Sequence, residues 1–160
     1  MNQHREDIFV DIQGYNCSYG YIPKEIAFYD GICCSNYLFK APFNKNMLSP
    51  EDKKIVQWSE EYHGLEWEMG NIEFNEIDVI LKHVLGFYSS PKIHVKGIEK
   101  GNILRKFLQE DYINNIPINR EPKLSKFKKI PGCYFHKNIN PWHCALTNVK
   151  LMYNYKFFYE

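Results

Sequence analysis

Short apolar runs separated by turn residues dominate the first forty residues of the chain. Residues 7–13, with the sequence DIFVDIQ, are apolar and β-branched and precede Gly14, which predicts a strand buried on both faces and ending at that glycine. The polar, glycine-bearing residues 15–21 predict a hairpin turn, and Asp30-Gly31 predicts a second tight turn. Further strands are expected at residues 24–29 and 32–39. The chain therefore opens with three antiparallel strands.

A helical spacing of apolar positions replaces the strand pattern after residue 48. Ser49 is suited to cap a helix, Pro50 is favoured at the first helical position, and the two carboxylates that follow stabilise the positive end of the helix. The segment 75–85 then repeats apolar residues on one helical face. These residues are Ile77, Ile80, Leu81, Val84 and Leu85.

Strands and helices alternate in the rest of the chain. The pattern predicts strands at 92–96 and 112–118, helices at 102–108 and 142–157, and a basic, proline-flanked loop at 120–131. The last helix is expected to be amphipathic. The resulting order, β-β-β-α-α-β-α-β-α, predicts an α/β fold with a mixed five-stranded sheet flanked by helices, in a single domain covering residues 1–160.

Composition also indicates where in the cell the protein is expected. Hydrophobic residues make up 44% of the chain, which suffices for one core, and the longest apolar runs are of strand length, too short to span a bilayer. The first residues, MNQHREDIF, contain no apolar signal region. Five cysteines in a chain of this kind favour a reducing compartment, where thiols stay free or bind metal. We therefore expect an intracellular protein, in the cytoplasm or the nucleus.

Charge is divided unevenly along the chain, although the net charge is only +1. Residues 1–91 hold 7 Lys and Arg against 14 Asp and Glu, whereas residues 92–137 hold 11 against 4. A basic segment of this kind can follow a phosphate backbone, and it is equally typical of a solvated face joined to a basic loop. Charge alone therefore leaves both interpretations open.

Three segments resemble landmarks of the DEDDh-type exonucleases of the RNase H-like superfamily. Asp11-Ile12-Gln13 is similar to the Asp-x-Glu pair on that family's first strand. Tyr62-His63-Gly64-Leu65 and the helix after it look like the family's His-Gly-Ile element. The run from His143 to Val149, HCALTNV, is similar to the His-x-Ala-Leu-x-Asp-Ala segment that opens the last helix. The resemblance implies the RNase H-like fold for nearly the whole chain.

The same resemblance implies that two-metal cleavage has been lost. That mechanism needs several carboxylates to hold two divalent ions about 4 Å apart. Asp11 is retained, but Gln13 and Asn148 carry amides where the family has acids. The remaining acid falls near Glu99-Lys100, where a lysine would repel a metal, and His143 stands at the position of the general base. Asp11 and His143 are therefore vestigial catalytic candidates.

Zinc is the most specific chemistry that the sequence indicates. Cys133 and His136 form a Cys-x2-His pair, and Cys144 begins the last helix, where the helix dipole favours a thiolate. Tetrahedral zinc needs a fourth ligand, for which His143 and Glu25 are candidates. The Pro-x-Glu-Ile strand and the Cys-x2-His…Cys-Ala-Leu-x-Asn-Val segment resemble the Maelstrom domain family, whose Glu-Cys-His-Cys set implies Glu25, Cys133, His136 and Cys144 as ligands of a structural Zn²⁺.

The Maelstrom resemblance also implies a ligand, single-stranded RNA or another nucleic acid, and a role in piRNA-guided transposon silencing. If the chain is an enzyme, this resemblance implies weak metal-independent cleavage of single-stranded RNA. Expected contacts are Arg105, Lys106, Arg120, Lys123, Lys126, Lys128 and Lys129, with Tyr134, Phe135 and Trp142 as stacking platforms. Two alternatives remain open: a protein-interaction scaffold or homodimer built on an inactive nuclease fold, and an active metal-dependent nuclease using Asp11, Glu99 and His143.

Overall fold

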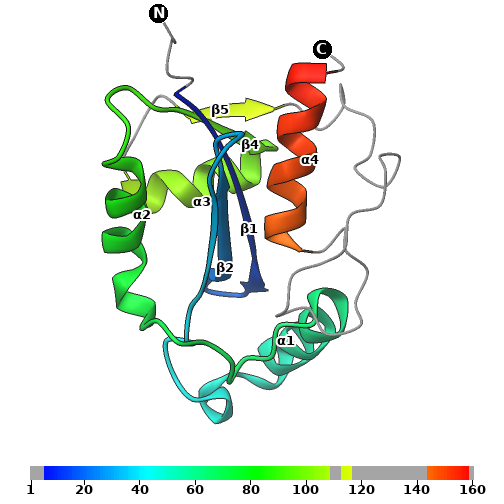
Figure 1. Cartoon of the computed structure of the whole chain (residues 1–160). Helices are drawn as coiled ribbons and strands as arrows, with labels where there is room; N and C mark the ends of the chain where they lie inside the picture. The colour runs from blue at the N-terminus through cyan, green and yellow to red at the C-terminus, as the bar shows by residue number, and fades with distance from the viewer. Residues whose placement is uncertain (1–5, 109–112, 117–143, 159–160) are drawn as a thin grey trace, which may run out of the picture.

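A computed structural model of the chain describes residues 6–108, 113–116 and 144–158. These residues form an α/β structure in which helices cover both faces of a mixed sheet (Figure 1). The strands are β1 (Asp7–Cys17), β2 (Gly20–Tyr29), β3 (Cys34–Leu38), β4 (Lys92–Lys96) and β5 (Ile113–Ile116). The α-helices are α1 (Pro50–His63), α2 (Ile77–Leu85), α3 (Ile98–Leu108) and α4 (Ala145–Phe158), with short 3₁₀ turns η1 (Lys45–Met47) and η2 (Phe74–Glu76). The α/β class and the order of elements predicted from sequence are confirmed.

Strand β1 occupies the centre of the sheet, whose order is β3-β2-β1-β4-β5. It pairs antiparallel with β2 and parallel with β4. At the two edges of the sheet, β3 pairs antiparallel with β2, and β5 pairs parallel with β4. A central strand covered on both faces must be apolar on both, which explains the nearly continuous run from Ile8 to Ile12. The one acid within that run, Asp11, is the starting point of the site described below.

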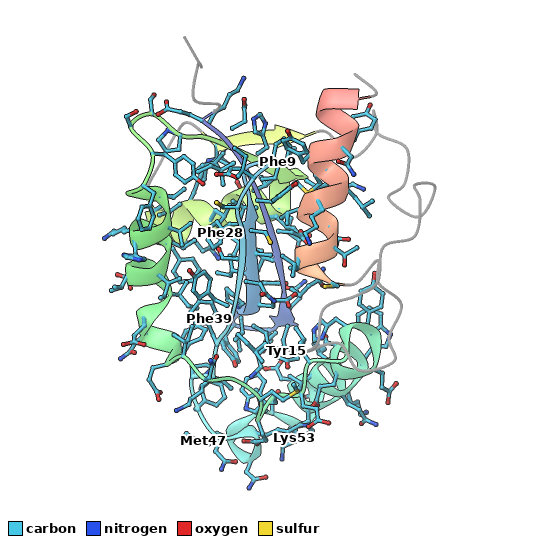
Figure 2. The ribbon with its side chains drawn as sticks, in the orientation of Figure 1. Phe9, Tyr15, Phe28, Phe39, Met47 and Lys53 are labelled. Atoms are coloured by element: carbon cyan, nitrogen blue, oxygen red, sulfur yellow. The ribbon has the colours of Figure 1, made fainter. Side chains whose placement is uncertain are left out.

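Alternate residues of β1 enter two different cores, because successive side chains of a strand point to opposite faces. Ile8, Val10 and Ile12 pack in the core that also contains the buried side chains of α2 and α3. Phe9 packs instead against α4, with Ala145, Val149 and Met152. Figure 2 shows Phe28, a member of the first core, on the α2 side of the sheet. Asp11 and Gln13 have the parity of Phe9 and therefore face α4.

A third core joins the far end of the hairpin to α1. Tyr15, Cys17 and Ile22 pack with Leu48, Val56 and Trp67, and Tyr15 lies toward α1 in Figure 2. The helix begins as predicted: Ser49 Oγ accepts the backbone N–H of Asp52 at 3.1 Å. Asp52 in turn accepts the backbone N–H of Ser18 at 2.9 Å and its hydroxyl at 2.7 Å. These contacts fix the hairpin turn to the first turn of α1.

The predicted strand end at Gly14 is wrong, and so is the long turn at residues 15–21. Strand β1 continues to Cys17, and the pairing with β2 shifts by one residue between Gln13 and Gly14, which leaves Lys24 without a partner on β1. Gly14 is needed for close approach, since a Cβ there would overlap the carbonyl oxygen of Ile22. The glycine therefore marks a bulge within a long strand.

The boundaries of other elements also differ from those predicted from the sequence. The third strand begins at Cys34 because Asp30 Oδ1 accepts the N–H groups of Ile32, at 2.8 Å, and Cys33, at 2.6 Å, which holds residues 30–33 in a turn. Helix α3 begins at Ile98, four residues before the predicted start. In α4, Thr147 and Leu151 are buried in addition to Ala145, Val149 and Met152. The buried arc of this helix is therefore wider than that of an amphipathic helix. The predicted loop at 120–131 lies outside the described residues.

Replacing Gly14 with alanine is expected to lower the free energy of unfolding by roughly 2–4 kcal/mol, because the new methyl group has to displace the β2 backbone. Gly86 provides the control. It has a helical φ of −65°, and a Cβ there would meet nothing closer than 3.1 Å, so Gly86→Ala is expected to change stability by less than about 1 kcal/mol. Urea denaturation of both variants checks this. Equal effects would show that the bulge does not require glycine.

No helix in residues 6–108 or 144–158 is both long enough and apolar enough to cross a bilayer.

Candidate functional site

A layer of buried polar side chains lies between the sheet and α4. Asp11 and Gln13 of β1 are 1% and 9% exposed, and Glu25 of β2, which pairs with Gln13, is 0% exposed. Acidic groups are rarely buried so completely unless they are paired. The partners of these three side chains therefore define what the site can do.

Both oxygens of the Asp11 carboxylate are engaged. The ammonium of Lys100, from the first turns of α3, forms an ion pair with Oδ1. Asn148 of α4 donates its Nδ2 to Oδ2 at 3.0 Å, and Gln13 donates its Nε2 to the same oxygen at 3.3 Å. Gln13 and Asn148, the two amides that stand where the expected exonuclease motifs have acids, thus contact Asp11 together with Lys100.

One cation and two amides occupy the space around Asp11, and this arrangement disfavours metal binding. A divalent ion would have to displace the Lys100 ammonium, which is 28% exposed, and would find a single carboxylate. Within residues 6–108, 113–116 and 144–158, no three His, Cys, Asp or Glu side chains are grouped to hold a metal ion. In this part of the chain, Asn148 Oδ1 is the one buried side-chain polar atom without a hydrogen bond.

Negative charge near the cluster also affects a neighbouring phenol. Tyr21, at the start of β2, has a pKa raised far above its usual value, first by burial and then by the charges of Asp11 and Glu99. The phenol therefore stays neutral at physiological pH and can act as a hydrogen-bond donor but not as a base. Glu99 itself is exposed at the start of α3, so it is not one of the groups bound to Asp11.

Glu25 connects strand β2 to the start of α4. Its Oε1 accepts the backbone N–H of Ala145 at 2.9 Å, and its Oε2 accepts Nδ2 of Asn36 at 3.3 Å. A carboxylate at this end of a helix is stabilised by the unpaired N–H groups and the helix dipole. Cys144, which is completely buried, directly precedes Ala145. The strand acid and the helix-start thiol that we expect to share a zinc ion are therefore held at the same end of α4.

Several predicted site residues lie outside the described residues. They are the zinc ligands Cys133 and His136, the vestigial candidate His143, and the basic contacts Arg120, Lys123, Lys126, Lys128 and Lys129. The structure places Glu25 and Cys144 of the zinc set and Asp11 of the catalytic set. The remaining cysteines are a buried strand residue, Cys17, and two exposed residues at the turn into β3, Cys33 and Cys34.

The two basic contacts within the described part of the chain differ in role. Arg105 is half-buried, donating Nη1 to Asn102 Oδ1 at 3.1 Å and Nη2 to the carbonyl of Ile113 at 3.2 Å, so it holds α3 to β5. Lys106 is exposed and lines a groove with Lys82 and Phe107, between α2 and α3. Lys106 is therefore available for a ligand, whereas Arg105 has a structural function.

His63, part of the predicted His-Gly element, is a structural connector. Its Nδ1 accepts the backbone N–H of Leu65 at 3.1 Å, which leaves Nε2 to donate to the carbonyl of Gly14 at 3.0 Å. Gly64 ends α1 in the left-handed conformation, with φ of 71°. The motif thus fixes the end of α1 against the β1 bulge.

Lys24 is a buried lysine whose role the sequence did not indicate. It is 0% exposed, and its Nζ donates to the carbonyl of Trp67 at 2.7 Å and to that of Met69. Burial lowers the pKa of Lys24 to about 8, an effect that the more distant Glu68 and Glu60 partly oppose. The pattern of apolar and polar residues does not indicate that Lys24 is buried, because the bulge opposite Gly14 changes the direction in which its side chain points.

The shifted pKa of Lys24 predicts a pH-dependent stability. Because the folded-state pKa lies below the usual value of 10.5, the unfolded chain binds more protons between pH 8 and 10.5, and the Lys24 contribution to stability rises with pH in that window. Comparing wild type with Lys24→Met isolates this contribution. Between pH 8 and 10.5, the free energy of unfolding of the wild type should rise by about 2–3 kcal/mol relative to that of Lys24→Met. A constant difference would contradict the assignment.

Comparisons of the chain with protein-family models, with curated proteins and with solved structures find no match.

Proposed function

We propose that this chain is an inactive nuclease domain of the RNase H-like type that binds single-stranded RNA. The ion pair between Lys100 and Asp11 is the observation that carries the proposal. A lysine ammonium supplies the positive charge at a position where a metal-dependent nuclease needs divalent ions, and amides replace the other carboxylates. The domain keeps the architecture of such a nuclease without its reaction centre.

The arrangement of the sheet supports the RNase H-like assignment. Three antiparallel strands are followed by two parallel ones, with β1 in the centre and α4 across the face that carries Asp11. Gln13, Lys100 and Asn148 also converge on Asp11, as expected if amides and a lysine stand where such a nuclease has acids. Convergence is the stronger support, because it brings together the one acid that the resemblance retains and the two amides that it singles out.

A structural zinc ion is the second part of the proposal. Glu25 is a buried acid that reaches the N–H directly after Cys144, so the two side chains belong to one small region between β2 and α4. Cys133 and His136 would complete a tetrahedral set of four protein ligands, which leaves no open position for a water molecule. The ion would fasten the last helix to the sheet, and its binding would contribute to folding.

RNA binding is proposed from the basic residues of the second half of the chain, with Lys106 as their representative in the described part. In a mobility-shift assay, single-stranded RNA is expected to bind at about 50 mM salt and to weaken as salt rises, because each phosphate contact releases counterions. Lys106→Gln should lower the affinity roughly two- to fivefold and flatten the salt dependence. Lys53→Gln, which removes an exposed lysine of α1 outside the basic segment, is the matched control. No binding at that salt concentration would contradict the proposal.

A protein-binding scaffold is the second candidate function. It is favoured by large apolar side chains that remain exposed in the described residues. They are Tyr19, Ile32, Met47, Trp58, Tyr62, Val79, Phe87 and Ile98. Isolation of one stoichiometric partner, unaffected by ribonuclease treatment, would favour this candidate over RNA binding. In either case we place the protein inside the cell, and a role in piRNA-guided silencing remains the biological hypothesis.

A further inference from the structure

Helices α2 and α3 cover the same face of the sheet (Figure 1). A groove of about 580 Å³ lies between them and includes residues of the η2 turn before α2. This volume falls within the range of about 300–1,000 Å³ that is typical of sites for small molecules. The side chains that give the groove its chemistry are Phe74, Asn75, Asp78, Lys82, Lys106 and Phe107. Cationic, hydrogen-bonding and aromatic groups are therefore combined in one small volume.

The two lysines of the groove come from different helices. Lys82 belongs to α2 and Lys106 to α3, and both are exposed. Neither ammonium forms an ion pair or a hydrogen bond with another described residue, whereas Lys40, Lys45 and Lys100 are each paired with a carboxylate. Two cations that share a groove and have no carboxylate partner attract an anion, and a phosphate has enough oxygens to accept hydrogen bonds from both.

Asp78 restricts which anion can enter the groove. Its side chain is half-buried there, and it has no hydrogen-bond or ion-pair partner within the part of the chain that the structure describes. A carboxylate only accepts hydrogen bonds and repels a bare anion. The ligand therefore has to bring a hydrogen-bond donor together with its negative charge. The ribose of a ribonucleotide does so, because its hydroxyl groups donate and it carries the phosphate.

Phe74 and Phe107 give the groove an aromatic surface. Both rings are half-buried, since they pack against the core under α2 and α3 as well as lining the groove. Packing on the core side holds each ring in place for a ligand on the groove side. Nucleobases stack on aromatic rings of this kind. Asn75 is exposed in the same groove, and its amide can both donate to and accept from the edge of a base.

We propose that the groove between α2 and α3 binds one ribonucleotide unit. Lys82 and Lys106 bind its phosphate, Asp78 accepts a ribose hydroxyl, and the base stacks on Phe107. The unit comes either from a free nucleotide or from an RNA strand, and for the second source the inference rests on the RNA binding proposed above. An acidic peptide fits less well, because it brings further carboxylates toward Asp78.

Calorimetric titration of the full chain with adenosine 5′-monophosphate (AMP) tests the proposal. Adenosine and inorganic phosphate should each bind at least about tenfold more weakly than AMP, because each lacks half of the ligand. The 2′-deoxy nucleotide should bind about threefold more weakly, and Asp78→Ala should remove that difference. Octa-adenylate that binds at least about tenfold more tightly than AMP identifies RNA as the source, and a smaller difference identifies the free nucleotide.

Variants of the lysines and of the aromatic ring locate the site. Lys82→Gln/Lys106→Gln should weaken AMP binding about tenfold. Phe107→Leu keeps an apolar side chain against the core but removes the ring, and should weaken AMP binding about threefold. The matched control is Lys53→Gln/Lys54→Gln, which removes two exposed lysines of α1 that do not line the groove and should change the affinity less than about twofold.

Three results would overturn the proposal: no AMP binding at about 1 mM, equal affinity for AMP and phosphate, or unchanged AMP affinity in Lys82→Gln/Lys106→Gln. Tighter binding of octaglutamate than of AMP would also overturn it, by identifying a site for acidic peptides. Octa-adenylate bound equally by the wild type and the lysine variant would contradict the groove as the RNA site and leave RNA binding itself intact. AMP bound without octa-adenylate would contradict the proposed function and support the groove as a site for free nucleotides.

Discussion

Replacing Lys100 with methionine is expected to lower the free energy of unfolding by about 2–4 kcal/mol at neutral pH. The substitution removes the cation from an Asp11 carboxylate that is 1% exposed, and a buried charge without its partner is strongly destabilising. The lower part of that range allows for the partial exposure of Lys100. Urea denaturation measures the loss.

A double variant separates this ion pair from general packing. Asp11→Asn keeps the shape of the side chain and removes the buried charge, so Lys100→Met/Asp11→Asn should recover much of the stability that Lys100→Met loses. If the two substitutions were simply additive, Lys100 would not be compensating the charge of Asp11. Exposed Lys82→Met is the control for loss of a lysine, with an expected change within about 0.5 kcal/mol.

Zinc removal is expected to have the largest effect on stability. The purified protein should contain about one zinc per chain, and a chelator should lower its stability by about 4 kcal/mol relative to protein in free zinc a thousandfold above the dissociation constant. Elemental analysis and denaturation in the presence and absence of chelator provide the two measurements. A zinc-free protein of unchanged stability would contradict the prediction.

Two ligand variants determine where the zinc is held. Glu25→Gln retains an oxygen for the N–H of Ala145 but loses the carboxylate, so it should keep the helix cap and lose the metal. Cys144→Ser should also lose the metal, whereas Cys33→Ser, at an exposed turn, should retain it. Zinc retained in Glu25→Gln and lost in a His143 variant would transfer the fourth ligand to His143.

Much of the fold could be predicted from local patterns. The β4 strand and the Ser49-capped helix follow directly from apolar spacing and capping residues, and both are confirmed. The β1 strand was predicted too short, because a glycine within a long strand has the same sequence signature as a glycine that ends one. Only the approach of the Ile22 carbonyl, a contact between two strands, distinguishes the two cases.

The site could be predicted only where a motif singled out the residue. The strand motif and the last-helix motif indicated Asp11, Gln13 and Asn148, but a sequence aligned by motif leaves the register near Glu99-Lys100 open. The structure shows that Lys100 is the one of these two residues that pairs with Asp11. Lys24 carried no signal at all, since its burial depends on the bulge and on carbonyl groups more than forty residues away.

Cleavage of 5′-labelled single-stranded RNA, with and without Mn²⁺, tests the central claim most directly. Since the Lys100 ammonium pairs with Asp11 and the amides of Gln13 and Asn148 donate to its other oxygen, adding Mn²⁺ should produce no cleavage above the metal-free rate. Mn²⁺-stimulated cleavage that disappears in Asp11→Ala would contradict the account, because it would show that Asp11 still holds a catalytic metal ion.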